Sequence, residues 1–266
     1  MPPPRRPKLG QHFLASEGFR QRIVDALLLR PDDLVVEIGP GRGAMTELLA
    51  ACAARVIAVE LDPVLAGRLT EALRANQRIE IHRADILATD VRGICHKYGA
   101  EKCFVFGNLP FYITSPIIHH VLDYSGSIRG MAFLVQREVA DRITADPGSR
   151  DYGYLSVLVQ LHSEPRIALK VPPGAFAPPP KVQSALVEFK MRPRFPEWTA
   201  SEHSKFLEFV KACFAQKRKN LLNNLEGTYS RATTSEALRT LGLSSAVRAE
   251  QMPLEMLARL FRQLSR

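Results

Sequence analysis

The stretch LVVEIGPGRG, residues 34–43, joins a short apolar run to a glycine-rich turn. The run Leu34–Gly39 has the length and the branched side chains of a buried strand. The glycine-rich turn Gly39–Gly43 follows at once, and Ala44–Cys52 beyond it has helical spacing. A strand, a glycine turn and a helix in this order are typical of the first unit of a nucleotide-binding α/β sheet.

The same alternation of apolar runs and helical segments continues along the chain. Further buried strands are predicted at Arg55–Glu60, Ile79–His82, Cys103–Gly107 and Met131–Gln136. Helical spacing lies between some of them, at Pro63–Ala75 and Pro116–Leu122. Strands separated by helices form right-handed crossovers, so we expect a parallel sheet that is covered on both faces.

The sheet is expected to end in an antiparallel hairpin. Leu155–His162 and Ser184–Phe189 have strand-like composition, and no helical segment lies between them. The intervening stretch is broken by Pro172, Pro173 and Pro178–Pro180. We therefore predict that both runs are strands at the edge of the sheet.

Beyond Met191 the pattern changes to helices alone. Helical spacing recurs at Ser204–Ala215, Lys217–Leu225, Ser235–Leu241 and Leu254–Leu264. The segment Arg192–Pro196 has the charged residues and prolines of a linker. We therefore expect an α/β domain over residues 1–191 and a small all-α domain over residues 192–266.

The positive charge of the chain is concentrated at its two ends. The formal net charge is +9, of which residues 1–8 contribute +3, residues 9–190 contribute zero and residues 191–266 contribute +6. A basic arm and a basic tail domain fit the footprint of a phosphate-binding protein, although solubility alone would also explain the excess.

Composition argues against several classes of protein. No run of about 18 apolar residues is present, and Met1–Lys8 lacks the apolar core of a secretory signal, so neither a membrane span nor secretion is expected. The four cysteines form no Cys-x-x-Cys pair and no histidine cluster has ligand spacing. We therefore expect no metal site and no disulfide framework, and scattered thiols suit a reducing cytoplasm.

Three positions at successive strand ends point to a nucleotide ligand. Gly39 and Gly41 let the backbone approach a ligand without a clash at Cβ. Glu60 ends the second predicted strand and would accept hydrogen bonds from both ribose hydroxyls, while Asp85 follows the third and would accept the amine of an adenine. The glycines and Glu60 also fit an NAD site, and an Asp in a loop is more often a turn former.

The tetrapeptide NLPF, residues 108–111, lies at the carboxyl end of the fourth predicted strand, where open α/β sheets place their sites. Adenine N6 is a poor nucleophile because its lone pair is delocalised into the ring. The Asn108 oxygen would accept one N6 hydrogen and a backbone carbonyl near Leu109 or Pro110 the other, which aims the lone pair at a methyl group. Phe111 would stack on the base, and Pro110 would stiffen the loop. Alone, the tetrapeptide also fits a strand cap with a buried ring.

Together these motifs resemble those of the ribosomal RNA adenine dimethyltransferase family that acts on the small subunit. The similarity runs nearly end to end. It covers KLGQHFL at 8–14, EIGPG at 37–41, Glu60, Asp85, NLPF at 108–111, FAPPPKV at 176–182, QKRK at 216–219 and RAE at 248–250. The related erythromycin-resistance methyltransferases share the early motifs, whereas the last two stretches are more similar to the small-subunit family.

The resemblance implies a Rossmann-like class I methyltransferase sheet with a small all-α C-terminal domain. It implies S-adenosyl-L-methionine as methyl donor and N6,N6-dimethylation of two adjacent adenosines near the 3′ end of 16S rRNA. The partner would be a 30S subunit assembly intermediate, and the protein would act in the cytoplasm, as a monomer and away from membranes.

The resemblance also implies roles for individual residues. Those expected to bind the donor are His12, Leu14, Glu37, Gly39, Gly41, Glu60, Leu61, Asp85, Ile86 and Asn108. Those expected at the reacting base are Asn108, Leu109, Pro110, Phe111 and Phe176, with the two phenylalanines sandwiching the adenine. Those expected to contact RNA are Arg5, Arg6, Lys8, Lys181, Lys217, Arg218 and Lys219, the last three at the start of a helix.

Two positions depart from the pattern of the family. Phe111 stands where the family usually has tyrosine, and stacking does not require the hydroxyl. Tyr112 stands where many members carry a small polar residue, which would alter the packing of the loop.

Three other functions fit parts of the sequence. An adenine N6-methyltransferase of the macrolide-resistance type would modify 23S rRNA instead. A catalytically silent nucleic-acid-binding assembly or transcription factor on the same fold is disfavoured by the intact Glu60, Asp85 and Asn108. An NAD oxidoreductase lacks a residue that would serve as the acid of hydride transfer.

Overall fold

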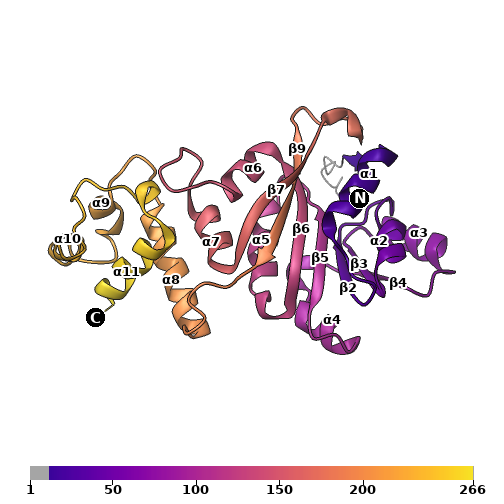
Figure 1. Cartoon of the computed structure of the whole chain (residues 1–266), viewed down its shortest axis with the longest axis horizontal. Coiled ribbons are helices and arrows are strands. Elements are labelled where there is room, and N and C mark those ends of the chain that lie inside the picture. Colours follow the sequence, from indigo (N-terminus) through magenta and orange to yellow (C-terminus); the bar gives the residue numbers. More distant parts are fainter. Residues whose placement is uncertain (1–11, 266) are drawn as a thin grey trace, which may run out of the picture. The chain divides into compact units, whose positions relative to one another are not determined.

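The computed structural model describes residues 12–265 (Figure 1). Three positions expected to contact RNA, Arg5, Arg6 and Lys8, lie outside the described residues. No helix within the described range is both long and apolar enough to cross a membrane.

The chain forms two compact units. The first comprises Met1–Ala140 and Pro165–Met191, and the second comprises Asp141–Glu164 and Arg192–Arg266. The segment Asp141–Glu164 falls within the range expected for the α/β domain, and it belongs to the helical unit instead.

A seven-stranded sheet forms the centre of the first unit, with strand order β4-β3-β2-β5-β6-β9-β7. In that order the strands are Ile79–Arg83, Arg55–Glu60, Leu34–Ile38, Cys103–Asn108, Ile128–Gln136, Ser184–Met191 and Ser163–Val171. The five strands β4, β3, β2, β5 and β6 are parallel, and β9 is antiparallel to β6. The expected Rossmann-like parallel sheet with a small antiparallel edge is therefore confirmed.

Helices connect the parallel strands, as the spacing predicted. The first unit contains α1 (Glu17–Leu27), α2 (Thr46–Cys52), α3 (Pro63–Leu73), α4 (Val91–Lys97), α5 (Thr114–Leu122) and the start of α6 (Arg137–Ile143). Helix α3 is capped at its N-terminus by Asp62. The Asp62 carboxylate accepts from the backbone N–H groups of Val64 at 2.8 Å and Leu65 at 3.2 Å. Pro63 occupies the first helical turn, where its missing N–H costs nothing.

Alternate residues of the central strands face helices α1 and α2. Phe104 and Phe106 of β5 pack in one cluster with Ile23 of α1 and Leu49 of α2, and all four are buried. Since side chains alternate along a strand, Val35 and Glu37 of β2 also point to this face. Val35 belongs to the same cluster, whereas Glu37 lies one step further toward the carboxyl end of the sheet.

The expected strand at Leu155–His162 is wrong, because Tyr154–His162 forms helix α7. Nearly every side chain of that run is buried, so its apolar pattern has no period that would distinguish a helix from a strand. The edge strand begins directly afterwards, as β7 at Ser163–Val171. Pro165 within β7 is compatible with an edge position, where its missing N–H leaves no ladder bond unmade.

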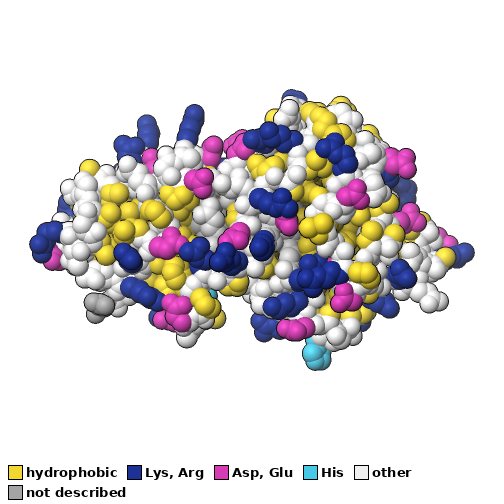
Figure 2. All heavy atoms as spheres, viewed as in Figure 1, with side chains coloured by type: hydrophobic (Ala, Val, Ile, Leu, Met, Phe, Trp, Pro, Cys, Tyr) yellow, Lys and Arg dark blue, Asp and Glu magenta, His cyan; other side chains and the backbone are white. Residues whose placement is uncertain are grey.

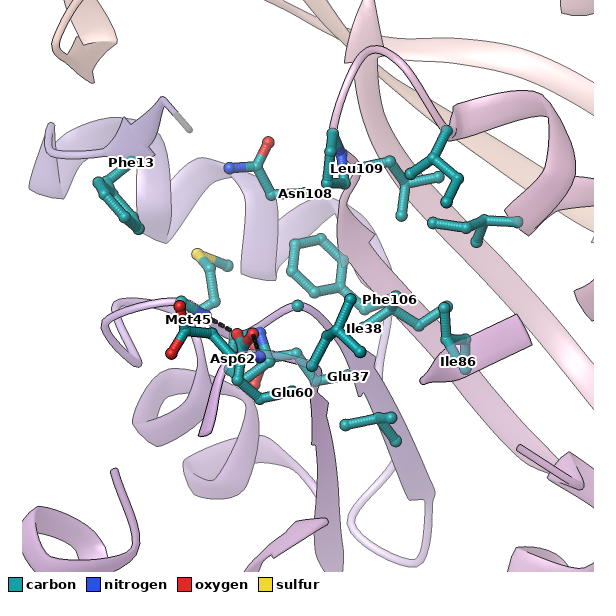
Figure 3. Close-up of a pocket in the computed structure, with 18 of the residues that line it drawn as sticks. Phe13, Glu37, Ile38, Met45, Glu60, Asp62, Ile86, Phe106, Asn108 and Leu109 are labelled. Carbon is teal, nitrogen blue, oxygen red and sulfur yellow. Dashed lines mark hydrogen bonds between the residues drawn. The ribbon is translucent and has the colours of Figure 1, made fainter. Parts of the chain in front are cut away.

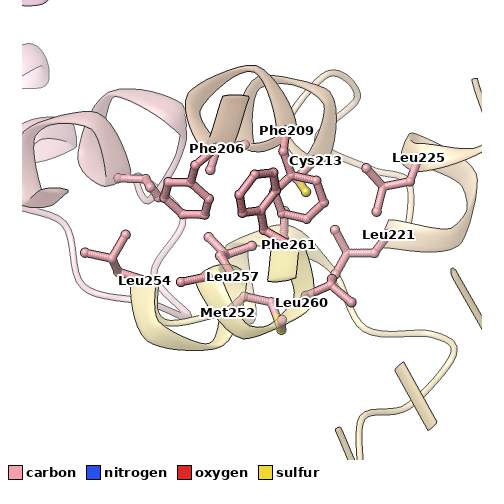
Figure 4. Packing of buried hydrophobic residues seen from close by; sticks show 14 of the residues in the cluster. Phe206, Phe209, Cys213, Leu221, Leu225, Met252, Leu254, Leu257, Leu260 and Phe261 are labelled. Atoms are coloured by element: carbon pink, nitrogen blue, oxygen red, sulfur yellow. The ribbon is translucent and has the colours of Figure 1, made fainter. Parts of the chain in front are cut away.

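The second unit is helical and has its own core. Its remaining helices are α8 (Ala200–Cys213), α9 (Leu221–Leu225), α10 (Arg231–Thr240) and α11 (Leu254–Leu264). Phe206 and Phe261 pack edge to face with their ring centroids 5.6 Å apart, and Phe209, Leu221 and Leu257 belong to the same cluster (Figure 4).

The expectation that Lys217, Arg218 and Lys219 begin a helix is also wrong. They form an exposed turn, and α9 starts only at Leu221. The cap is Asn220, whose side-chain oxygen accepts from the backbone N–H of Asn223 at 3.0 Å. A good N-cap outcompetes the preceding basic residues as the place where the helix begins.

Two very short strands complete the first unit. Strand β1 (Phe13–Leu14) pairs antiparallel with β8 (Phe176–Ala177), so that Leu14 lies opposite Phe176. Sequence reasoning predicted neither, because a pair of two-residue strands leaves no periodic pattern. Between β7 and β8 lies a 3-10 turn, Pro173–Ala175, whose Ala175 carbonyl accepts from the backbone N–H groups of Ala15 and Ser16.

Candidate active site

A cavity of about 410 Å³ lies at the carboxyl ends of the parallel strands (Figure 3). It spans β2 and β5, where the strand order reverses, and this is where open α/β sheets bind ligands. Its walls include every residue expected at the donor and the reacting base: His12, Leu14, Glu37, Gly39, Gly41, Glu60, Leu61, Asp85, Ile86, Asn108, Leu109, Pro110, Phe111 and Phe176. The volume is in the range of small-molecule sites.

The glycine turn after β2 depends on left-handed backbone conformations. Gly39, Gly41 and Gly43 have φ of 64°, 60° and 78°. A Cβ on Gly41 would lie 2.9 Å from Phe13 Cε1, and one on Gly43 would lie 2.6 Å from Leu69 Cδ2. The turn therefore presents bare backbone to the cavity, because a side chain at any of these positions would be strained, and one at Gly41 or Gly43 would also be crowded.

The Glu60 carboxylate ties this turn to the end of β3. Its Oε2 accepts from the Gly41 N–H at 3.1 Å, and its Oε1 accepts from the Asp62 N–H at 2.9 Å. The side chain is buried, so these two bonds fix its orientation. Each carboxylate oxygen retains a further lone pair with which a ligand hydroxyl can bond.

Glu37 is the less satisfied of the two buried carboxylates. It is 2% exposed, and its Oε2 has no hydrogen-bond partner among the described residues. Burial raises the pKa of Glu37 to about 7; the nearby Thr46 hydroxyl acts in the opposite direction, and the charge of Glu60 adds to the rise. A buried acceptor that lines a cavity without a partner is a place for a cationic or N–H group of a ligand.

Asp85 follows β4 and forms a turn at the same time as it lines the cavity. Its Oδ1 accepts from the Leu87 N–H at 2.9 Å and caps the 3-10 turn Ile86–Ala88. Ile86 is buried behind this turn, whereas Leu61 across the cavity wall is 57% exposed. The turn-forming role and the predicted place in the cavity are therefore compatible.

Asn108 at the end of β5 is oriented by the N-terminal segment. Its Nδ2 donates to the His12 carbonyl at 3.1 Å. Because a carbonyl only accepts, the amide nitrogen must face His12, and the Asn108 oxygen is then turned away from it. Figure 3 shows the Asn108 nitrogen pointing toward the strand that carries Phe13.

The carbonyls of the loop after Asn108 are not equivalent. The Pro110 carbonyl accepts from the Ile113 N–H at 3.2 Å and from the Thr114 hydroxyl at 3.0 Å. These two bonds occupy both of its lone pairs. Of the two backbone acceptors that sequence reasoning left open, Leu109 is therefore the one available to a ligand.

Residues 12–14, called here the strap, lie across one wall of the cavity. The His12 ring stacks on Phe111 with a centroid separation of 5.5 Å and an interplanar angle of 28°. Its Nδ1 lies 2.7 Å from the Pro178 carbonyl. Phe13 lies against the glycine turn, with the Arg42 guanidinium 4.6 Å from the centre of its ring.

Sequence reasoning missed several apolar residues of the cavity wall. Phe13, Met45 and Phe106 line it, and so does Tyr112, which is 62% exposed. Phe13 lies between His12 and Leu14, which were both predicted to bind the donor, so its neighbours could have identified it. Met45 and Phe106 follow from the three-dimensional packing alone.

Lys181, Lys217, Arg218 and Lys219 are not among the residues that line the cavity. Lys181 is exposed in the loop between β8 and β9, and Lys217, Arg218 and Lys219 form the exposed turn of the second unit. The Lys217 ammonium donates to the Arg150 carbonyl of the same unit. Among residues 12–265, no group of three or more His, Cys, Asp or Glu could hold a metal ion.

Comparison with known proteins gives consistent matches over almost the full length. A family model described as ribosomal RNA adenine dimethylase matches residues 4–266. Ribosomal RNA small subunit methyltransferase A of Acidobacterium capsulatum is 46% identical over 97% of this chain and 91% of its own length. The protein of the same name from Geobacter metallireducens is 39% identical over 97% of this chain and 95% of its own length.

Solved structures with this fold include methyltransferases. The 23S rRNA methyltransferase ErmE has a TM-score of 0.72 and 30% identity, covering 96% of this chain and all of its own. A dimethyladenosine transferase from Plasmodium falciparum has a TM-score of 0.78 at 22% identity, covering 94% of this chain and 96% of its own, which shows a shared fold.

The glycine turn generates a prediction about stability. Gly41→Ala should lower the free energy of unfolding by about 1–2 kcal/mol, because alanine resists the left-handed conformation and its Cβ meets Phe13. A Cβ added at Gly67 within α3 would meet no atom within 4 Å, so Gly67→Ala should raise the free energy of unfolding by about 0.5–1 kcal/mol. Urea unfolding of both variants measures this, and equal midpoints would contradict it.

Proposed function

Because the chain belongs to the ribosomal RNA adenine dimethylase family, we propose that it dimethylates N6 of two adjacent adenosines near the 3′ end of 16S rRNA, with S-adenosyl-L-methionine as methyl donor. The relatives at 46% and 39% identity have small-subunit names, whereas the 23S rRNA methyltransferase is 30% identical. The observation that carries the chemistry is the fixed Asn108 amide at the cavity, with its oxygen turned away from His12.

The residues of the cavity fit the donor. S-adenosylmethionine carries a sulfonium and an ammonium group, and the unpartnered Glu37 carboxylate supplies the negative charge that such a ligand requires. Glu60 would accept from the ribose hydroxyls, and Asp85 would accept the adenine amine of the donor beside Leu61 and Ile86. When bound, the donor supplies a methyl group on a sulfonium, which is already a strong electrophile.

Asn108 and Leu109 would orient the target amine. The Asn108 oxygen and the Leu109 carbonyl would each accept one N6 hydrogen, which draws the nitrogen lone pair out of the adenine ring. The lone pair would form the new C–N bond as the C–S bond breaks, so positive charge moves from sulfur to nitrogen. Since the methylated ammonium is acidic, it loses its proton without a dedicated base, and the enzyme contributes orientation and electrostatics.

The target adenosine must leave its stack to reach the cavity. Phe111 and Phe176 both line the cavity, and we assign to them the two faces of the flipped base. Stacking on an aromatic side chain contributes about 1–3 kcal/mol per base, which offsets part of the cost of unstacking. A purine amine in single-stranded or flipped form is therefore the substrate that this site fits.

We assign the contacts to the RNA backbone to exposed basic residues. Figure 2 shows Lys and Arg side chains interspersed with Asp and Glu on the visible face, so charge sign alone does not mark a docking face. Lys181 and the turn Lys217–Lys219 are the described candidates from the motifs. A 30S assembly intermediate as substrate implies action in the cytoplasm, and we propose that the protein acts as a monomer.

Loss of the Asn108 amide should abolish turnover. In Asn108→Ala, methyl transfer from labelled donor to unmethylated 30S particles should fall by about 100-fold or more, because one of the two N6 acceptors is lost. Donor affinity, measured by calorimetry, should change by less than about threefold, since Glu37, Glu60 and Asp85 remain. Gln77→Ala, an exposed amide ahead of β4, is the matched control.

Near-normal turnover in Asn108→Ala would rule out its assigned role. The same assay with 50S particles distinguishes the two ribosomal functions, because label in 23S rRNA rather than 16S rRNA would favour the macrolide-resistance type.

Donor binding should weaken in acid. The pKa of Glu37 is raised to about 7, so its carboxyl is ionised above that pH and neutral below it. Because the donor is cationic, the dissociation constant should rise by about tenfold between about pH 7.5 and about pH 6. Glu37→Gln should bind weakly at both values and lose the dependence. A pH profile of wild type as flat as that of the variant would contradict this role.

The basic turn should carry part of the salt dependence of RNA binding. Replacing Lys217, Arg218 and Lys219 together by alanine should weaken affinity for 30S particles and reduce the slope of log affinity against log salt by about 2. The control is a triple variant of exposed cations elsewhere in the same unit: Lys205, Lys211 and Arg259. An equal change of slope in both triple variants would show that only net charge matters.

A further inference from the structure

One face of the Phe111 ring is covered in this structure. The His12 imidazole lies on it with centroids 5.5 Å apart and planes 28° from parallel. A stacked ring occupies one face of its partner, so no base can use that face while the contact lasts. Phe111 is one of the two rings that the proposed function assigns to the target adenine.

The His12 ring is held more weakly than the backbone that carries it. The backbone is anchored twice, by the bond from Asn108 Nδ2 to the His12 carbonyl and by the adjoining β1–β8 pairing. The ring itself has the stacking contact and one exposed hydrogen-bond contact, from Nδ1 to the Pro178 carbonyl. Rotation about the side-chain bonds can therefore remove the ring from Phe111 and leave the Asn108 amide in place.

We propose that the His12 imidazole is a placeholder for the target base: it covers Phe111 in the free protein and is displaced when the flipped purine enters. The proposal rests on the proposed function and adds a specificity element to it. A purine has a larger stacking surface than an imidazole and displaces it, whereas a pyrimidine gains less from the exchange. The ring also shields the apolar face of Phe111 from water between turnovers.

The opposite role would be a fixed wall that helps to hold the base. The two roles predict opposite effects of removing the ring. As a placeholder, His12 competes with the RNA, so its loss tightens acceptor binding. As a wall, it contributes to the bound state, so its loss weakens acceptor binding.

Steady-state kinetics with 30S particles and saturating donor distinguish these roles. His12→Ala should lower the KM for particles by about two- to tenfold, the factor that one aromatic stacking contact is worth. The donor is kept saturating because His12 also lines the donor cavity, so that a change in donor binding does not enter this KM. His96→Ala, an exposed histidine of α4, is the control and should leave the KM for particles unchanged. A higher or unchanged KM in His12→Ala would overturn the placeholder.

A second measurement does not depend on turnover. In the full chain with labelled histidine and S-adenosylhomocysteine present, the carbon-bound protons of His12 should resonate upfield because of the Phe111 ring current. Phe111→Leu should remove this shift, and so should titration with adenosine monophosphate, whereas uridine monophosphate should have less effect. Absence of the shift in the free protein, or equal effects of the two nucleotides, would contradict the proposal. If 30S particles accept no methyl group at all, the proposed function fails while the resonance still reports the contact.

Discussion

The parallel register of β2, β3, β4 and β5 is the constraint on which the site depends. Ile38 lies opposite Val59 on one side and Gly107 on the other, and Glu60 lies opposite Arg83. Parallel strands in such a register end at the same edge of the sheet. The glycine turn, Glu60, Asp85 and Asn108 therefore meet around one cavity although about 70 residues of chain separate the first from the last.

The arrangement of the sheet could be predicted because its central strands β2, β3 and β5 are buried on both faces and segments of helical spacing separate several of the strands. The predicted and observed bounds of β3 coincide, and those of β2, β4 and β5 differ by one residue. The two wrong predictions, a strand at Leu155–His162 and a helix that begins at Lys217, have the same cause: the local sequence pattern does not determine which element forms there. Helix α7 is apolar on nearly all sides, so only its packing determines its period, and the basic turn was displaced from α9 by the cap at Asn220.

The residues around the cavity could be predicted from motif order, but their hydrogen bonds could not. The orientation of the Asn108 amide depends on His12, which lies 96 positions earlier in the chain. The strap reaches Asn108 because β1 pairs with β8, and both strands are too short to leave a pattern in the sequence. The Pro110 carbonyl is unavailable to a ligand in part because it accepts from the hydroxyl of Thr114, a residue of the next helix.

The two buried carboxylates of the cavity differ in how far the free chain satisfies their hydrogen-bonding capacity. Glu60 is satisfied by two backbone N–H groups, whereas Glu37 has an oxygen without a partner and a neighbour of like charge. Burying such a group destabilises the free protein, and a well-packed apolar residue at this place would remove that cost. A cationic ligand that bound Glu37 would convert this unfavourable group into an ion pair. Ligand binding and folding would thereby be linked, and an occupied cavity would stabilise the first unit by a free energy that grows with the logarithm of the ligand concentration divided by its dissociation constant.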